Sequence, residues 1–270
     1  MVNSAGNIRP HEMKQAENLL AFLSIILTAV VIVLMSEWAA PDSLGKLGYL
    51  GSPNFDSNIF SMHPVMMICG VFPAIVFAVN SSKFCSKKWI STIFHMTLHF
   101  CAVIFICIGL SAIIIYQDKF ELEHLRNSHA WVGVIFIILF FTNLVVGIVK
   151  IAVKVRFSAY LGKIQHLHTL LGIATIATII VAIATGIQSQ QSSGQGIRIC
   201  SNTAPACKLV NSLTILTLAA GGCVIFKEIL VMSANNAVAE TNNLTTTSAS
   251  TRAKSGNDLY MADVEEKIEG

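Results

Sequence analysis

Six long apolar runs decide what this chain can fold into. They are Leu19–Met35, Ile59–Val79, Ile90–Ile115, Ala130–Val149, His168–Ile187 and Leu209–Met232. An α-helix needs about 20 apolar residues to cross a bilayer, and each run is close to that length. Only 12% of the residues are charged, which is about half the share in a soluble domain. We therefore expect an all-α integral membrane protein, a bundle of six helices in contact with membrane lipid.

Polar segments flank this predicted bundle. Residues 1–18 are polar and mixed in charge, and we expect them to form a separate N-terminal segment. The loops between the runs are short, so residues 19–233 are predicted to be one six-span membrane domain. Residues 234–270 are rich in Thr, Ser, Asn and charge, cannot bury a core, and are predicted to be disordered. No basic cluster is interleaved with aromatic residues, so nucleic acid is not a predicted partner.

The distribution of Lys and Arg predicts the orientation. With the N-terminus in the cytoplasm, the inner segments hold 10 of these residues near the helix ends and the outer loops hold 5. Cytoplasmic loops carry the excess of Lys and Arg, so we expect both termini to be cytoplasmic. The choice between an endomembrane, a vesicle and the plasma membrane is left open. Cys200 and Cys207 then share an outer loop, where a disulfide between them can persist.

Seven of the eight histidines gather near the ends of spans two to five, and spans one and six contain none. His63 and His129 begin spans two and four on the outer side. His95 and His168 lie near the beginning of spans three and five on the inner side. At a rise of about 1.5 Å per residue, the two levels are separated by roughly 18 Å. An ionisable residue inside a membrane is costly and needs a partner, so these histidines are candidate ligands.

Two facing imidazoles can ligate a haem iron from both sides, which leaves no open position for oxygen and favours electron transfer. His129 and His168 are each followed four residues later by a glycine, Gly133 and Gly172. Residues four apart share a helix face, so each glycine leaves room beside an imidazole for a large, flat group.

Two choices among the histidines remain in spans three and five. His95 and His99 share a helix face, and we favour His95 because its depth matches that of His168. His166 and His168 point about 200° apart on a helix, so at most one of them faces the bundle. We assign His166 to the interface because His168 carries the glycine one turn later.

Two other classes of protein compete with an electron carrier. A proton-coupled transporter can use histidines as a relay without haem, although no span here carries a central Asp or Glu. A structural or adaptor protein with several spans is the third class. Both would be colourless when purified.

The motifs MHPVMM, IFHMTLH, NSHAWVGV, HTLLGI with a following TGI, and LVN together resemble the cytochrome b561 family. The resemblance extends from about Ile59 to Met232 and is closer to the shorter b561-domain branch, in which His-Leu precedes the span-four ligand as His124-Leu125 does here. It implies a four-helix core, spans two to five, that binds two b haems. The axial ligands that it implies are His63 with His129 and His95 with His168.

The resemblance also implies an activity. It predicts a transmembrane oxidoreductase that moves electrons from cytoplasmic ascorbate to ferric iron, as a chelate, or to monodehydroascorbate on the other side. Inner-face cations would attract the anionic donor, and the candidates are Lys87, Lys88, Arg156 and Lys163. His124 is the candidate for contact with the outer acceptor. Whether the chain forms a homodimer is left open.

Overall fold

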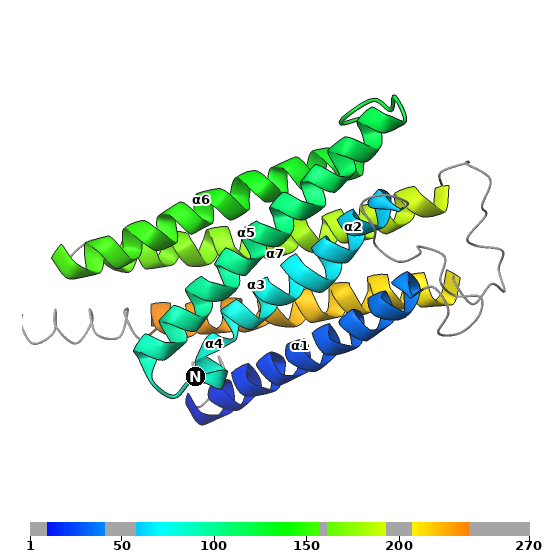
Figure 1. The fold of residues 1–270 in the computed structure, drawn as a ribbon. Helices are drawn as coiled ribbons and strands as arrows, with labels where there is room; N and C mark the ends of the chain where they lie inside the picture. The colour runs from blue at the N-terminus through cyan, green and yellow to red at the C-terminus, as the bar shows by residue number, and fades with distance from the viewer. Residues whose placement is uncertain (1–9, 41–57, 157–160, 193–206, 238–270) are drawn as a thin grey trace, which may run out of the picture. The chain divides into compact units, whose positions relative to one another are not determined.

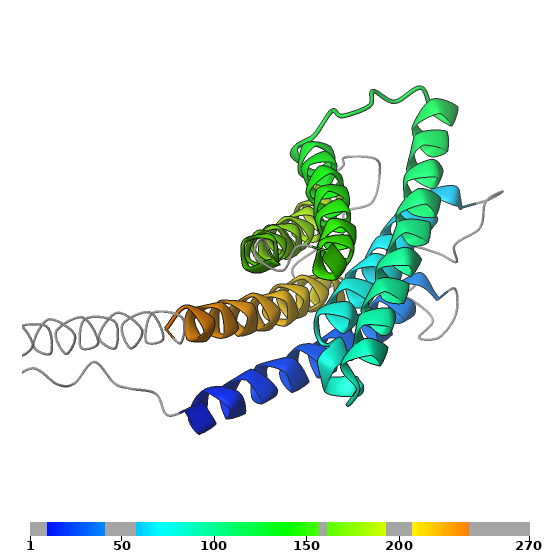
Figure 2. The same ribbon diagram turned by 90° about the vertical axis from the view of Figure 1, so that its left-hand side faces the viewer.

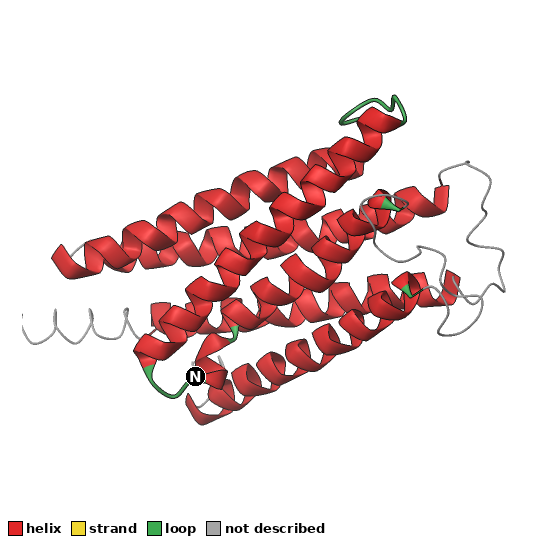
Figure 3. Ribbon diagram, in the orientation of Figure 1, coloured by secondary structure: helices red, strands yellow, loops and turns green. Residues whose placement is uncertain are grey.

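The computed structural model describes residues 10–40, 58–156, 161–192 and 207–237, and within them it is almost entirely helical and contains no strand (Figures 1 and 3). Six helices are long and apolar enough to cross a membrane, which confirms the predicted six-span helical architecture. The elements are α1 (Pro10–Ala39), α2 (Ile59–Val65), the π-helix η1 (Met66–Val71), α3 (Phe72–Val79), α4 (Ser81–Phe84), α5 (Lys88–Lys119), α6 (Ser128–Arg156), α7 (Leu161–Ser192) and the sixth span, Cys207–Ala237.

The first and the sixth helix extend past the predicted boundaries of the membrane domain. The first helix begins at Pro10, within the predicted N-terminal segment. Proline is favourable in the first turn of a helix because its missing N–H needs no partner there. The sixth span continues to Ala237, past the predicted boundary at residue 233. The chain divides into two compact units after Glu228, so residues 229–237 of this helix belong to the second unit. The predicted tail beyond Ala237 lies outside the described residues.

The second span forms the centre of the first unit. It consists of α2, η1 and α3 in succession, and most side chains from Ile68 to Ala78 are buried. Trp38 of α1 and Phe72 of α3 belong to the same apolar core and are only 2% and 1% exposed. This span is hydrophobic on all sides, as expected of a helix that is surrounded by other helices.

A π-helical segment interrupts the second span between two prolines. Pro64 lies in α2 and Pro73 lies in the first turn of α3, with η1 between them. Proline cannot donate the i→i−4 hydrogen bond and its ring clashes with the carbonyl four residues earlier. A π turn places one extra residue in a helix without ending it, and such turns are frequent at functional sites.

The closest helix packing lies within two groups of antiparallel helices. One group is α6 with α7, and the other is α5 with α2, η1 and α3, against which α1 also packs (Figure 2). Large apolar side chains are exposed on these helices and on the sixth span, among them Phe100, Ile138 and Ile215, which are 60–65% exposed. Such a surface is stable only in lipid, so the chain is an integral membrane protein.

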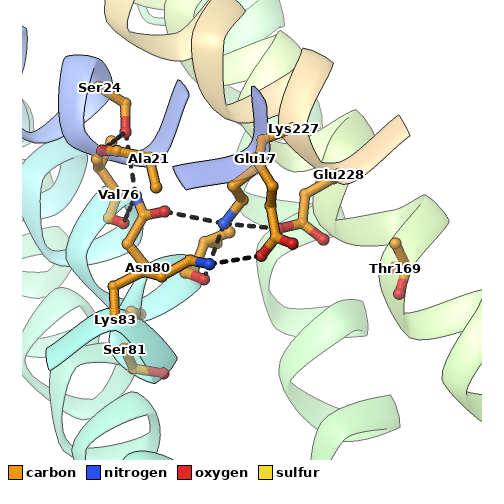
Figure 4. A network of polar contacts seen from close by, with 12 residues as sticks. Glu17, Ala21, Ser24, Val76, Asn80, Ser81, Lys83, Thr169, Lys227 and Glu228 are labelled. Carbon is orange, nitrogen blue, oxygen red and sulfur yellow. Dashed lines mark hydrogen bonds and ion pairs between the residues drawn. The ribbon is translucent and has the colours of Figure 1, made fainter. Parts of the chain in front are cut away.

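A buried lysine connects the sixth span to the C-terminal end of the second. Lys227 is 2% exposed, and its ammonium group donates to the Val79 carbonyl at 3.2 Å and to Asn80 Oδ1 at 2.8 Å, while Glu228 pairs with it at 2.9 Å. The Asn80 amide in turn donates to Ser24 Oγ of α1 at 3.1 Å (Figure 4). A cation at the C-terminal end of a helix satisfies its last carbonyls, so this network stabilises the end of α3.

Candidate cofactor site

Four histidines from four different helices face one another in two pairs. His63 of α2 and His129 of α6 have ring centroids 5.9 Å apart, and His95 of α5 and His168 of α7 have ring centroids 6.3 Å apart. We call them the outer pair and the inner pair, following the orientation predicted from the sequence. These are the four histidines predicted to pair, and each pair joins the two groups of closely packed helices.

The pairs lie at two levels of the bundle. On α5, His95 belongs to the inner pair, and Gly109, fourteen residues later, contacts His63 of the outer pair. On α7, His168 and the outer-level contact Ala182 are also fourteen residues apart. Fourteen residues of α-helix span about 21 Å, close to the predicted separation of the two levels.

Backbone carbonyls hold three of the four imidazoles by the same ring nitrogen. The hydrogen bonds run from His63 Nδ1 to Gly109 O at 3.1 Å, from His95 Nδ1 to Ala78 O at 2.8 Å, and from His129 Nδ1 to Ala182 O at 2.9 Å. A carbonyl can only accept, so each Nδ1 carries the proton. The lone pair of the neutral ring is therefore on Nε2. Metal-ligating histidines have this arrangement, with one nitrogen donating to a carbonyl or carboxylate and the other binding the metal.

These hydrogen bonds are reciprocal between antiparallel helices. His63 of the second span bonds to α5, and His95 of α5 bonds back to the second span at Ala78. On α5, His95 and the acceptor Gly109 are fourteen residues apart, whereas on the second span His63 and the acceptor Ala78 are fifteen residues apart. The π-helix η1 lies between His63 and Ala78 and accounts for the extra residue, because one π turn inserts one residue. The π-helix therefore keeps the second span in register with α5 at both levels.

Glycines on the opposite helix let two of the imidazoles approach the backbone. A Cβ atom on Gly186 of α7 would lie 2.8 Å from Cε1 of His129, and one on Gly147 of α6 would lie 3.1 Å from Cε1 of His168. Gly186 is one turn after Ala182, so a side chain there would crowd the imidazole that reaches this carbonyl. The sequence pattern did not single out these two glycines.

The glycines that the sequence did single out have different surroundings. A Cβ on Gly133 would meet nothing within 4 Å, so space is open one turn from His129. A Cβ on Gly172 would instead meet the Asn143 amide nitrogen at 3.5 Å. Space is therefore open at Gly133, whereas an amide lies beside Gly172, and room for a flat group stays a prediction.

The other histidines lie beside the pairs or away from them. The ring of His99 is 4.5 Å from that of His95 and 5.8 Å from that of Phe140, centroid to centroid, whereas His95 is the one with its ring opposite His168. His166 is exposed, as predicted for an interfacial residue.

His124 lies in the loop between α5 and α6 and is held on both ring nitrogens. Gln117 Oε1 is 2.8 Å from Nδ1, and Asp118 Oδ1 is 2.9 Å from Nε2. The imidazole is half exposed. Its orientation is therefore set by the end of α5, and contact with an acceptor remains a prediction.

The predicted inner cations begin the helices that carry the inner pair. Lys87 and Lys88 stand at the start of α5, Lys163 stands in the first turn of α7, and all three are exposed. The side chain of Arg156 lies outside the described residues. Cys207 is disulfide-bonded, and its predicted partner, Cys200, lies outside them as well.

Among the described residues, no three His, Cys, Asp or Glu side chains converge as a metal site. The histidines come in pairs, so a metal between two of them would take its other ligands from a cofactor. Fold and site together are those of a membrane helix bundle with paired histidines between facing helices, a place where bundles hold cofactors.

Comparison with known proteins also points to a membrane protein that binds a cofactor. Residues 62–193, which include both histidine pairs, match the family described as eukaryotic cytochrome b561. A transmembrane ascorbate ferrireductase of Arabidopsis thaliana is 26% identical over 79% of this chain and 92% of its own length. A plasma membrane ascorbate-dependent reductase of Xenopus laevis is 25% identical over 77% and 71%. A lysosomal membrane ascorbate-dependent ferrireductase of Danio rerio is 24% identical over 74% and 82%. Over residues 62–193 the chain is similar to the cytochrome b561 family, and haem b is the cofactor that this family implies.

The two pairs fit a haem. A metal held between two imidazole nitrogens, each at about 2 Å, places the ring centroids about 6 Å apart. The observed separations are 5.9 and 6.3 Å. Together with the Nδ1 hydrogen bonds and the open space at Gly133, these distances suit an iron whose axial positions are both filled by histidine.

Replacing Gly186 by alanine tests the close approach of His129. We expect the variant to retain the outer haem about 10- to 100-fold less well, the usual cost of disturbing a partner of a metal ligand. Haem per chain, measured optically during dilution or competition with apomyoglobin, reports the change. The matched control is Gly222→Ala, because a Cβ there meets nothing within 4 Å and alanine is the better helix former by about 1 kcal/mol. Equal haem retention in both variants would contradict the assigned contact.

Proposed function

We propose that this protein carries electrons across the membrane through two bis-histidine b haems, from cytoplasmic ascorbate to ferric iron or monodehydroascorbate on the opposite side. The observation that carries the proposal is the pair of facing imidazole couples at two levels. His95 with His168 would hold the inner haem, and His63 with His129 the outer one. The relatives that match most of this chain are named as ascorbate-dependent reductases.

Haem supplies a one-electron couple when it is bound. One histidine from each of two facing helices would hold the iron on both sides, which would leave no position for oxygen. The Nδ1 hydrogen bonds hold His63, His95 and His129 in one tautomer and one orientation, so these three ligands need not rearrange when the oxidation state changes. The apolar helices exclude water from both sites, which favours electron transfer without side reactions.

The donor site is proposed at the inner end. Ascorbate is an anion that gives up one electron and one proton to become monodehydroascorbate, and each ferric ion takes up one electron. Lys88 precedes His95 by seven residues, and Lys163 precedes His168 by five, so both cations lie within about 10 Å of the inner pair along their helices. We assign the electrostatic attraction of ascorbate to these two, with Lys87 and Arg156.

The orientation is proposed with both termini in the cytoplasm. The excess of Lys and Arg supports it, and so does the disulfide of Cys207, because disulfides persist on the oxidising side of a membrane. His124 would then face the acceptor.

Optical spectra of the purified protein test the function. We expect two haems per chain in the oxidised protein, most of the haem reduced by ascorbate, and the remainder by dithionite. Vesicles loaded with ascorbate should also reduce an external ferric chelate. Reduction by dithionite alone would keep the cofactor and discard the donor. Absence of haem after expression with sufficient haem would overturn the proposal in favour of a histidine-relay transporter.

A further inference from the structure

One of the four paired imidazoles lacks the hydrogen bond that the other three make. His168 Nδ1 is buried without a hydrogen-bond partner, and so is Oδ1 of Asn143 on α6. A buried polar group without a partner costs about 1–3 kcal/mol, so a donor and an acceptor left unpaired in one region require an explanation.

The spacing of the other ligands identifies Asn143 as the partner of His168. His129 is followed fourteen residues later by Asn143, as His95 is followed by Gly109 and His168 by Ala182. The backbone carbonyl of Asn143 lies near the His168 ring but does not complete a hydrogen bond to Nδ1, and a Cβ on Gly147, one turn later, would touch the same ring. Asn143 therefore occupies on α6 the place that Ala182 occupies on α7.

The Asn143 side chain lies at the same point of the bundle. It is 9% exposed, and its amide nitrogen approaches the Cβ position of Gly172, one turn after His168. The amide is therefore enclosed between the α6 turn that touches the imidazole and the α7 turn that follows it. Ala182, at the equivalent place on the outer level, has no side-chain acceptor to offer.

We propose that the Asn143 side-chain amide is the positioning group of His168 and accepts its Nδ1–H when the inner haem is bound. A rotation of the amide pairs the unpaired acceptor with the unpaired donor. The hydrogen bond makes the imidazole a more electron-rich ligand, which stabilises the ferric form and lowers the reduction potential of the inner haem. This inference rests on the proposed function, since it requires haem at the inner pair.

Redox titration of three variants tests the assignment. Asn143→Leu removes the amide at nearly constant volume, Asn143→Gln retains it, and Thr142→Val removes a polar group from the exposed side of the same helix, where Thr142 bonds only to its own helix at Ile138. We expect the midpoint potential of the inner haem to rise in Asn143→Leu, to stay near the wild-type value in Asn143→Gln, and not to move in Thr142→Val. The outer haem should be unaffected in all three.

The outcomes separate this inference from the proposed function. The haem that remains in the His168→Ala variant identifies the outer potential. An unshifted inner potential in Asn143→Leu, with both haems present, overturns the role of Asn143 alone. A wild-type protein without an inner haem overturns the proposed function as well. Should Asn143→Leu not fold, ¹⁵N-histidine NMR of the diamagnetic ferrous wild type decides, because an Nδ1 proton of His168 without a hydrogen-bond shift contradicts the proposal.

Discussion

Replacing His95 or His168 by alanine is expected to remove the inner haem and spare the outer one. Haem content should fall from two to one per chain, because an iron with one axial histidine lost is no longer held across the two helix groups. Replacing His63 or His129 should remove the outer haem instead. Any of the four changes should abolish electron transfer from vesicle-enclosed ascorbate to an external acceptor.

Low-temperature EPR and reduced-minus-oxidised spectra distinguish the remaining haem in each variant. His99→Ala is the matched control, because its imidazole lies beside His95 on α5 but not opposite another histidine of a pair. It should retain two haems. The pairs would be assigned wrongly if all four ligand variants kept their full haem content. The same would follow if His99→Ala lost a haem and the four ligand variants did not.

Replacing Lys227 by methionine is expected to lower the stability of the protein by about 3–5 kcal/mol, the usual cost of removing one partner from a buried ion pair. The change leaves the Glu228 carboxylate, the Val79 carbonyl and Asn80 Oδ1 without their common cation. Methionine keeps most of the volume of the lysine stem, so the loss reports the charge and its hydrogen bonds. Thermal melting in detergent, followed by a thiol-reactive dye, measures it.

Lys83→Met is the control for this experiment. Lys83 also forms an ion pair, with Glu17 at 2.7 Å, but both side chains are about a quarter exposed, and such pairs contribute about 0–1 kcal/mol. Equal melting shifts in the two variants would mean that burial of Lys227 has no special role. Haem content at low temperature should be unchanged in both, because neither lysine contacts a paired histidine.

The architecture could be predicted from the sequence because a membrane span has a simple signature. A run of about 20 apolar residues needs no tertiary contact to be recognised, and all six runs became long helices. The ends were less predictable. Residues 10–18 are too polar to count as a span, yet they continue α1, because helix formation depends on backbone hydrogen bonding and not on hydrophobicity alone.

Within the site, the depth of each histidine along its helix could be predicted from the sequence, but the residues that contact its ring could not. Counting residues from the helix ends placed His95 and not His99 at the level of His168, and the structure sets their rings opposite each other. The partners of Nδ1 are backbone carbonyls, which every residue has, so no side chain marks them. Gly147 and Gly186 leave room for histidines of the neighbouring helix, whereas the sequence analysis expected this room from glycines on the same helix as each histidine. The difference arises because the rotation of one helix against another cannot be read from either sequence alone.

The reciprocal hydrogen bonds also bear on how the protein responds to its surroundings. Two helices tied to each other at two points, fourteen residues apart, cannot slide without breaking both bonds together. In the proposed function, the distance between the two haem levels would then be set by the helices and not by the thickness of the bilayer. A membrane that thins or thickens could tilt the bundle, but it would leave this distance, and with it the rate of electron transfer, unchanged.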